Sequence, residues 1–265
     1  MGTIIAVANQ KGGVGKTTTV INLAASLGIK GKKTLCVDCD TQGNATTGYG
    51  IKKKSLNNTV HEVMTGECSI RNAIITTEFK NVDIIPSSQS LAGADIELSK
   101  MENRLNRLKM QLLTVKDEYD YIIIDCPPAL GLITLNALVA ADKLLIPMLA
   151  EFYALEGLSQ LVNTIKAVKQ NYNPALDIIG ILFTMYDGRL NISKQVVEEV
   201  AKYFPNKIFK TKIPRNVRLS EAPSHGKPVV YYDKHSQGAE MYKKLAAEIT
   251  GEDDHGIIKS LFSKK

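Results

Sequence analysis

Short apolar runs alternate along the chain with longer amphipathic stretches of helical length. Several runs, such as YIIID and LLIP, are apolar without alternation, which is typical of strands that helices cover on both faces. The predicted strands are Thr3–Ala8, Lys33–Cys39, Val82–Pro86, Tyr121–Asp125, Lys143–Met148, Ile178–Thr184 and, at an edge, Lys207–Ile213. The predicted helices are Lys16–Leu27, Ser90–Leu113, Leu130–Ala140, Leu155–Asn171, Ile192–Tyr203 and Gln237–Thr250. This alternation predicts an α/β fold with one doubly wound, mostly parallel sheet and helices on both faces.

The length of 265 residues allows one large α/β domain or two small ones. No internal repeat, low-complexity tract or linker rich in proline and glycine divides the chain. We therefore expect one domain over residues 1–250 and a tail over 251–265. Apolar residues make up 44% of the chain and charged residues 23%, which excludes wholesale disorder, a collagen-like structure and a coiled coil.

The start of the chain shows no basic segment, apolar core or cleavage site of a signal peptide. No apolar run reaches the roughly 18–20 residues of a membrane-spanning helix, so we expect a cytoplasmic protein.

Cys36 and Cys39 form a CxxC pattern on a predicted strand. Side chains three apart on a strand point to opposite faces, so these residues are expected to be buried structural thiols.

Residues 11–18, KGGVGKTT, join the first predicted strand to the first predicted helix. This is a variant of the phosphate loop, in which glycines let backbone N–H groups curl around phosphate oxygens. Gln10 stands where the common pattern has its first glycine. We expect Lys16 to reach the β- and γ-phosphates and the Thr17 hydroxyl to ligate Mg²⁺. The residues predicted to bind nucleotide here are Lys11, Gly12, Gly13, Val14, Gly15, Lys16, Thr17 and Thr18.

A second lysine, Lys11, precedes the glycines of this loop. It is poorly placed to hold the nucleotide of its own subunit, but in a two-fold dimer it could reach phosphates bound by the partner. There it would neutralise charge that develops during phosphoryl transfer, as an arginine finger does. The alternative is a solvated surface lysine.

Three acidic residues follow or end predicted strands. Asp125 should lie at the carboxyl edge of the sheet, where such a carboxylate holds Mg²⁺, often through water. Asp40 lies just past the second strand and could orient the attacking water or accept its proton. Asp38 is better placed to brace the phosphate loop and the metal shell. Asp38 and Asp40 could instead be ordinary carboxylates at the end of a strand.

Five segments together resemble the ParA/Soj group of deviant-Walker partition ATPases, with MinD as a more distant relative. They are KGGVGKTT, VDCDTQGNATTG, IIIDCPPALG, EFYALEGLSQL and IPRNVRLSEAPSHGKPV. The resemblance runs from about Gly2 to about Ile249. It implies ATP and Mg²⁺ as cofactors, a sandwich homodimer in the ATP state, and DNA binding without sequence preference. It also implies slow ATP hydrolysis that a ParB-like partner stimulates, and a nucleoid-associated protein.

The resemblance also implies roles for single residues. It assigns Lys11 to the signature lysine that crosses between subunits, and Asp40 to hydrolysis. Gly12 would have to stay small because two loops meet there across the dimer. Pro214 and Asn216 would lie near the adenine ring.

Positive charge in the C-terminal half is a candidate DNA-binding surface. The net charge of +6 permits a nucleic-acid partner without requiring one. Arg189 and Arg218 match positions that relatives use in basic patches, where contacts to phosphate need no base readout. Nearby lysines that could add charge are Lys194, Lys202, Lys210 and Lys212. The alternative for each of these residues is a solvated cation.

The last ten residues, 256–265, leave a second function open. If they are helical, one face is apolar and lysines flank it, as in the membrane-targeting helix of MinD-type relatives. A membrane-cycling positioning ATPase is therefore the alternative function, unless the tail packs on its own domain or frays. A third class, an enzyme that couples ATP to electron transfer or metal loading, needs paired cysteines or a metal-ligand cluster. The sequence offers no convincing one.

Overall fold

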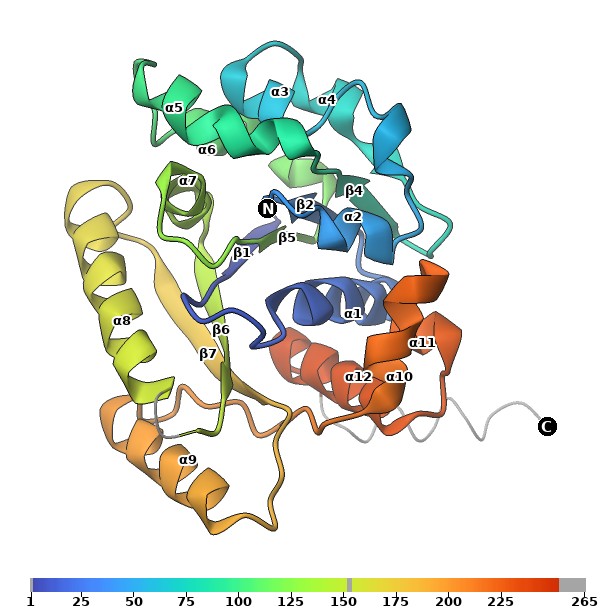
Figure 1. Ribbon diagram of the computed structural model, residues 1–265, viewed down its shortest axis with the longest axis vertical. Helices are drawn as coiled ribbons and strands as arrows, with labels where there is room; N and C mark the ends of the chain where they lie inside the picture. The colour runs from blue at the N-terminus through green and yellow to red at the C-terminus, as the bar shows by residue number, and fades with distance from the viewer. Residues whose placement is uncertain (1, 152–153, 253–265) are drawn as a thin grey trace.

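The computed structural model of the protein describes residues 2–151 and 154–252. Within them, seven strands form one sheet in the order β3-β4-β2-β5-β1-β6-β7 (Figure 1). The strands are β1 (Thr3–Val7), β2 (Thr34–Asp38), β3 (Ile75–Thr76), β4 (Val82–Ile85), β5 (Tyr121–Asp125), β6 (Lys143–Leu149) and β7 (Asp177–Thr184). Neighbouring strands are parallel except for the antiparallel pair β3 and β4. The predicted doubly wound, mostly parallel sheet is confirmed.

Helices cover both faces of this sheet (Figure 1). The α-helices are α1 (Lys16–Ile29), α2 (Asn44–Gly48), α3 (Val60–Thr65), α4 (Ile70–Ala73), α5 (Ala94–Ser99), α6 (Arg107–Leu113), α7 (Leu132–Ala140), α8 (Ala154–Asn171), α9 (Asn191–Tyr203), α10 (Val217–Glu221), α11 (Val229–Tyr232) and α12 (Gln237–Thr250). The 3₁₀ turns are η1 (Lys53–Ser55), η2 (Gln89–Gly93), η3 (Lys116–Glu118) and η4 (Ala222–His225).

The central strand β1 shows how the sheet separates two hydrophobic cores. Ile4 and Ala6 belong to the core that packs α3 and α5 to α9 against one face. Ile5 and Val7 belong to the core on the other face, together with α1, α11 and α12. Successive side chains of a strand point to opposite faces, so both faces of β1 have to be apolar. This explains why the strand shows no hydrophobic alternation.

The prediction of one continuous helix over Ser90–Leu113 is wrong. The segment forms η2, α5 and α6, and Asn103 between α5 and α6 has a left-handed φ of +53°. The buried Asn136 of α7 accounts for the restart of the helix. Its Nδ2 donates to the Arg104 carbonyl at 2.7 Å, and its Oδ1 accepts from the Leu108 N–H at 3.2 Å. A side chain on another element therefore determines where α6 begins.

The predicted edge strand Lys207–Ile213 is also wrong as a regular strand. The segment lies alongside β7 and bonds to it at separate points. The Ile181 N–H donates to the Lys207 carbonyl at 2.6 Å, and the Ile213 N–H donates to the Phe183 carbonyl at 2.9 Å. These bonds produce isolated bridges and no continuous ladder. Strand β3 and the short helices α2, α3, α4, α10 and α11 were not predicted.

Most of the predicted C-terminal tail, from residue 253 onward, lies outside the described residues. Residues 256–265, which carry the predicted amphipathic pattern, lie outside the described residues. The boundary between a domain over 1–250 and a tail over 251–265 therefore stays a prediction. Among the described helices, none is both long enough and apolar enough to cross a membrane.

Close packing of α1 against the sheet gives a stability prediction. A Cβ at Gly28 would clash with the Lys80 carbonyl oxygen and lie 2.9 Å from Val82 Cγ2. Gly28→Ala is therefore expected to lower the free energy of unfolding by about 1–3 kcal/mol through overpacking. Gly157→Ala in α8, where a Cβ would meet no atom within 4 Å, is the matched control. It should raise stability by about 0.5–1 kcal/mol. Equal melting temperatures for the two variants would contradict the packing argument.

Candidate nucleotide-binding site

The loop between β1 and α1 holds the residues predicted to bind phosphate. Gly13 and Gly15 have left-handed φ angles of +73° and +83°, and Gly15 is the N-cap of α1. The loop opens into a cavity of about 350 Å³ that Asp40 and Pro128 also line. A Cβ at Gly12 would meet no atom within 4 Å in the subunit. The requirement for a small residue at Gly12 in a dimer therefore stays a prediction.

Lys16 lies at the first position of α1 and lines this cavity. Its side chain is buried, and Nζ donates to the carbonyl oxygen of Lys11 at 3.1 Å. Burial lowers the pKa of the Lys16 ammonium, and the charges of Asp125 and Asp40 oppose this shift. The site thus holds a desolvated cation at a helix N-terminus, which is an arrangement that favours an anionic ligand.

Asp125 lies on β5 at the carboxyl edge of the sheet, and its side chain is fully buried. Within the described residues, neither carboxylate oxygen has a hydrogen bond of ordinary geometry. The Thr17 side chain is nevertheless close enough to lower the pKa of this carboxyl. Burial and the charge of Asp38 have the larger effect and raise it well above its usual range. A buried carboxylate with unused oxygens beside a threonine hydroxyl fits a site for Mg²⁺ and its water.

Asp38 and Asp40 stand on and just after β2, beside Asp125. The register pairs Asp38 with Asp125 on neighbouring strands. Asp38 is buried and accepts hydrogen bonds from the N–H and hydroxyl of Thr46, at 2.8 and 2.7 Å. Burial raises the pKa of Asp38 to about 6, and the hydrogen bonds from Thr46 oppose this shift. These bonds brace the residues that follow β2 and not, as predicted, the phosphate loop.

Asp40 lines the same cavity as Lys16 and is partly exposed. Its Oδ1 accepts a hydrogen bond from the Gln42 N–H at 2.9 Å. The structure therefore brings the predicted Asp40, Lys16 and Thr17 to one cavity, with Asp125 beneath them. The role of Asp40 in hydrolysis stays a prediction.

Lys11 forms an ion pair within its own subunit. Its Nζ lies 2.7 Å from Oε2 of Glu151, which follows β6, and both side chains are partly exposed, at 39% and 56%. Glu151 was not predicted as the partner of Lys11, because nothing along the chain links two residues 140 positions apart. The predicted role of Lys11 in the partner's site stays a prediction.

Pro214 and Asn216 line a second, smaller cavity of about 70 Å³ next to the phosphate loop. Gly15 and Met185 line both this cavity and the larger one. Asn216 also caps α10, because its Oδ1 accepts a hydrogen bond from the Arg218 N–H at 3.0 Å. The two predicted adenine contacts are thus placed beside the loop that would hold the phosphates.

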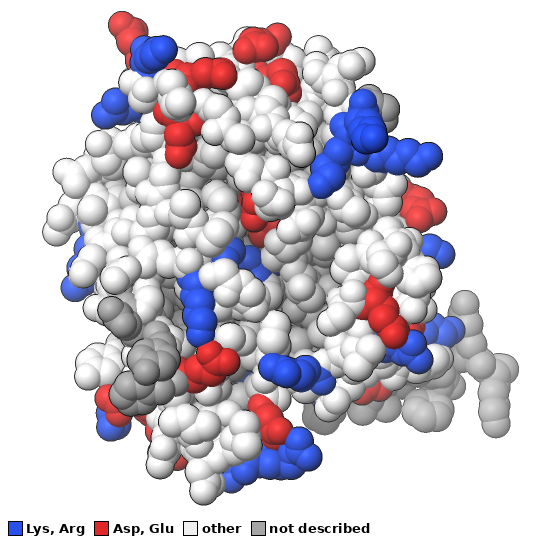
Figure 2. Space-filling model, in the orientation of Figure 1, with Lys and Arg blue, Asp and Glu red and all other residues white. Residues whose placement is uncertain are grey.

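The predicted DNA-binding arginines are exposed and paired with acidic residues. Arg189 Nη2 lies 2.7 Å from Oδ2 of Asp187, and Arg218 Nη1 lies 2.8 Å from Oε2 of Glu221. Figure 2 shows positive and negative side chains interspersed over one face of the molecule. Positive side chains on this face gather in local groups, the most compact of them at the upper right of Figure 2, so any attraction of DNA comes from such groups.

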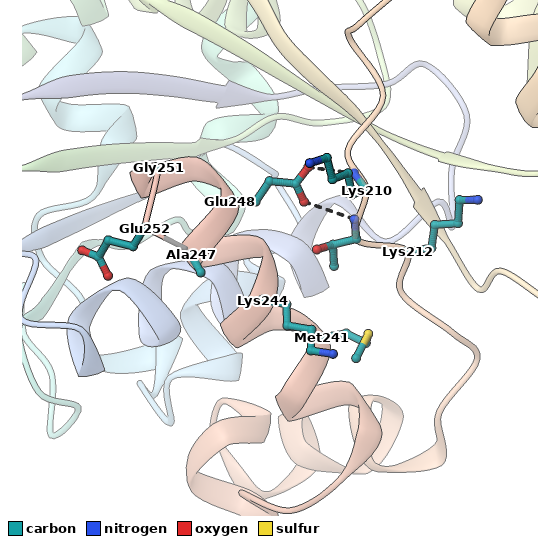
Figure 3. A pocket seen from close by; sticks show the side chains of 9 residues that line it. Lys210, Lys212, Met241, Lys244, Ala247, Glu248, Gly251 and Glu252 are labelled. Carbon is teal, nitrogen blue, oxygen red and sulfur yellow. Dashed lines mark hydrogen bonds between the residues drawn. The ribbon is translucent and has the colours of Figure 1, made fainter. Parts of the chain in front are cut away.

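Two hollows beside α12 collect such cations. The first, of about 530 Å³, is lined by Lys210, Lys212 and Lys244. Figure 3 shows these lysines around the hollow, and Glu248 accepts hydrogen bonds from the backbone N–H groups of Lys210 and Thr211, at 2.7 and 3.1 Å. The second, of about 860 Å³, shares Lys212 and adds Arg189 and Arg215. Lys244 and Arg215 were not predicted, whereas Lys194 and Lys202 lie on α9 and line neither hollow.

The cysteines agree with the prediction of structural thiols. Cys36 and Cys39 are buried and belong to different cores, so their side chains point to opposite faces of the sheet. Cys36 Sγ lies 3.1 Å from the Tyr49 hydroxyl, and burial raises the pKa of this thiol to about 12. In the part of the chain that the structure describes, no three His, Cys, Asp or Glu side chains form a metal-binding group.

The doubly wound sheet and the glycine-rich loop before α1 define a P-loop nucleotide-binding protein. A family model described as an AAA domain matches residues 2–178. The sporulation initiation inhibitor protein Soj of Bacillus subtilis (strain 168) is 55% identical, covering 94% of this chain and 98% of the relative. The chromosome partitioning protein ParA of Myxococcus xanthus (strain DK1622) is 53% identical, covering 96% and 89%. The chain belongs to the ParA/Soj family of chromosome-partitioning ATPases.

A solved structure supports the same fold. Cobyrinic acid a,c-diamide synthase from Mycobacterium smegmatis, with bound ADP and magnesium, has a TM-score of 0.82 and 34% sequence identity to this chain. The match covers 100% of this chain and 97% of the synthase. The predicted family and fold class are therefore both confirmed.

Proposed function

We propose that this protein is an ATP-dependent dimeric switch that binds DNA without sequence preference. It hydrolyses ATP to segregate or position chromosome or plasmid DNA in the nucleoid, together with a ParB-like partner. One observation carries the proposal: a desolvated Lys16, a Thr17 hydroxyl and Asp40 share one cavity, with a buried Asp125 beneath it. Two relatives, Soj and a chromosome partitioning ParA, support the cellular role.

ATP and Mg²⁺ are the proposed cofactors. The backbone N–H groups of residues 12–17 and the Lys16 ammonium would bind the phosphates, and Pro214 and Asn216 would line the adenine site. Thr17 would hold Mg²⁺ directly and Asp125 through water. The metal, when bound, neutralises negative charge on the phosphate oxygens. Asp40 would orient the attacking water or accept its proton.

Lys11 would complete the site of the partner subunit in an ATP-bound dimer. An exposed ion pair contributes only about 0–1 kcal/mol, so the contact with Glu151 holds Lys11 weakly. The space around Gly12 leaves room for a second phosphate loop to approach. Hydrolysis would therefore be slow in a single subunit, because the cation that offsets the developing charge comes from elsewhere.

DNA would bind through its phosphates, along Arg189, Arg218 and the two hollows that share Lys212. On this surface each subunit presents only a few cations, and two of them, Arg189 and Arg218, are paired with carboxylates. A dimer would present two copies of this surface at once. Dimerisation can therefore control DNA affinity through bivalency, without a large change within either subunit.

A double charge reversal tests the proposal. Arg189→Glu with Arg218→Glu is expected to weaken ATP-dependent retention on random-sequence DNA at least about tenfold, because it replaces phosphate contacts by repulsion. Binding of ATP should not change, since neither side chain lines the phosphate-loop cavity. Lys80→Glu with Lys100→Glu changes the net charge equally, at exposed positions elsewhere, and should retain DNA binding. Equal retention by the two double variants would contradict the proposed surface.

A further inference from the structure

Four residues at the candidate site, three of them buried beneath its cavity, form a closed ring of hydrogen bonds. They are Asp38, Asp40, Thr46 and Ser87. Asp38 accepts from the Asp40 N–H at 3.2 Å and from the Thr46 hydroxyl at 2.7 Å. The Thr46 hydroxyl in turn accepts from the Ser87 N–H at 2.9 Å. The Ser87 hydroxyl closes the ring by donating to the Asp40 carbonyl at 2.7 Å.

Three members of this ring are removed from solvent. Asp38, Thr46 and Ser87 have no exposed surface, whereas Asp40 is partly exposed and lines the cavity. The single hydroxyl hydrogen of Thr46 points at Asp38, and a lone pair of the same oxygen accepts from Ser87. Each bond's donor and acceptor are therefore fixed by the neighbouring bonds, so the hydrogens of the ring have a single arrangement.

The ring joins parts of the chain that are distant in sequence. Ser87 follows β4, whereas Asp38, Asp40 and Thr46 lie at the end of β2, in the loop and in α2. The strands β2 and β4 are neighbours in the sheet, which brings Ser87 to the loop. Both backbone groups of Asp40 bond to this ring, its N–H to Asp38 and its carbonyl to Ser87. The carbonyl also accepts from the Gly43 N–H at 2.9 Å. The ring thus helps to set where Asp40 stands in the cavity, together with the Gln42 N–H that donates to its carboxylate.

We propose that Thr46 and Ser87 are positioning residues for ATP hydrolysis, because they hold the main chain of Asp40 where its carboxylate meets the attacking water. The inference rests on the proposed function, in which Asp40 acts on that water. Neither Thr46 nor Ser87 lines the cavity itself. They therefore act on the rate of hydrolysis and not on the binding of nucleotide.

Removal of one hydroxyl at a time tests this role. Thr46→Val keeps the shape of the side chain, and Ser87→Ala removes only an oxygen. Each is expected to lower kcat about tenfold, because a small displacement of a catalytic group is costly in rate. The Kd for a non-hydrolysable ATP analogue should change less than about twofold, since the phosphate-binding groups stay in place. Thr46→Ser retains the hydroxyl and should hydrolyse ATP within about twofold of the wild type.

The same variants contain the controls. In an Asp40→Asn background, Ser87→Ala is expected to leave the residual rate unchanged, because a positioning residue has no effect without the group it positions. If the melting temperature of Thr46→Val shows that this variant does not fold, the test rests on Ser87→Ala. Equal loss of kcat in Thr46→Val and Thr46→Ser, or unaltered kcat in Thr46→Val and Ser87→Ala, would overturn the inference. A wild type that binds but never hydrolyses ATP would instead overturn the proposed function, and this inference with it.

Discussion

Lys16→Ala is expected to lower the affinity for ATP about 100-fold, because a lost hydrogen bond between a cation and a phosphate costs about 3 kcal/mol. Titration of a fluorescent ATP analogue in the presence of Mg²⁺ measures this change directly. The expected effect is large because the lysine is already desolvated before any ligand binds.

The structure explains why the ammonium of Lys16 is available to an anion. Its side chain is buried at the start of α1, and burial lowers the pKa of the ammonium. It donates to the Lys11 carbonyl, which leaves further N–H donors of the ammonium for a ligand. The cost of burying the charge is already part of the folded protein. A phosphate therefore gains the interaction without having to desolvate the lysine.

Thermal unfolding separates lost binding from lost folding. Without nucleotide, the melting temperature of Lys16→Ala should stay within a few degrees of the wild type, since removing a buried charge also removes its desolvation cost. With ATP and Mg²⁺, the wild type should gain stability by mass action, and the variant should gain much less at the same ATP concentration. Lys30→Ala, at the other end of α1 and paired with Glu252, is the matched control. Unaltered stabilisation of Lys16→Ala by ATP would contradict the assigned role.

The fold was predictable from sequence wherever the hydrophobic pattern within an element determines how that element packs. The interior positions of strands β1, β2, β5 and β6 are apolar without alternation, because helices cover both faces of the sheet. The errors fall where a distant residue determines the local structure. Asn136 starts α6 from across the helical layer, and no pattern within Ser90–Leu113 indicates it. The segment 207–213 has a strand-like composition, but its irregular bonds to β7 prevent a ladder.

The candidate site divides in the same way. The phosphate loop, Asp40 and Asp125 were predictable, because a loop after one strand and acidic residues at the ends of neighbouring strands converge on one edge of a parallel sheet. Thr46 and Ser87 were missed, although both lie near residues that were singled out. Their signal is their hydrogen bonding to Asp38 and Asp40 across β2 and β4. Sequence spacing alone carries no trace of such bonds.

A mixture of two inactive variants is expected to recover ATPase activity if Lys11 acts across the dimer. Alone, Lys11→Ala and Asp40→Asn should each hydrolyse ATP about 10²-fold or more slowly than the wild type, since one lacks the trans cation and the other the group that acts on water. Both variants keep Lys16 and Thr17, so both should bind ATP and enter dimers.

The recovery follows from which residues meet in each site of a mixed dimer. The pocket of the Lys11→Ala subunit retains Asp40 and receives Lys11 from the Asp40→Asn subunit, so this site is complete. The other pocket lacks Asp40 and also receives no Lys11. Random pairing in an equal mixture makes half of the dimers mixed, and each has one complete site. The activity should therefore reach about a quarter of the wild-type value.

A role of Lys11 within its own subunit gives a different result, because both pockets of a mixed dimer would then lack one essential group. The mixture would stay as inactive as its components, and this outcome would exclude the trans assignment.

Glu151→Gln provides an independent check, because it removes the charged partner that holds Lys11 in the subunit. If Lys11 must leave Glu151 to reach the partner, the ATPase rate of Glu151→Gln should not fall. A loss of rate comparable to that of Lys11→Ala would instead show that the active state needs the ion pair. Rates measured at several protein concentrations complete the test, since activity that depends on two subunits rises more steeply than protein concentration below the dimerisation constant.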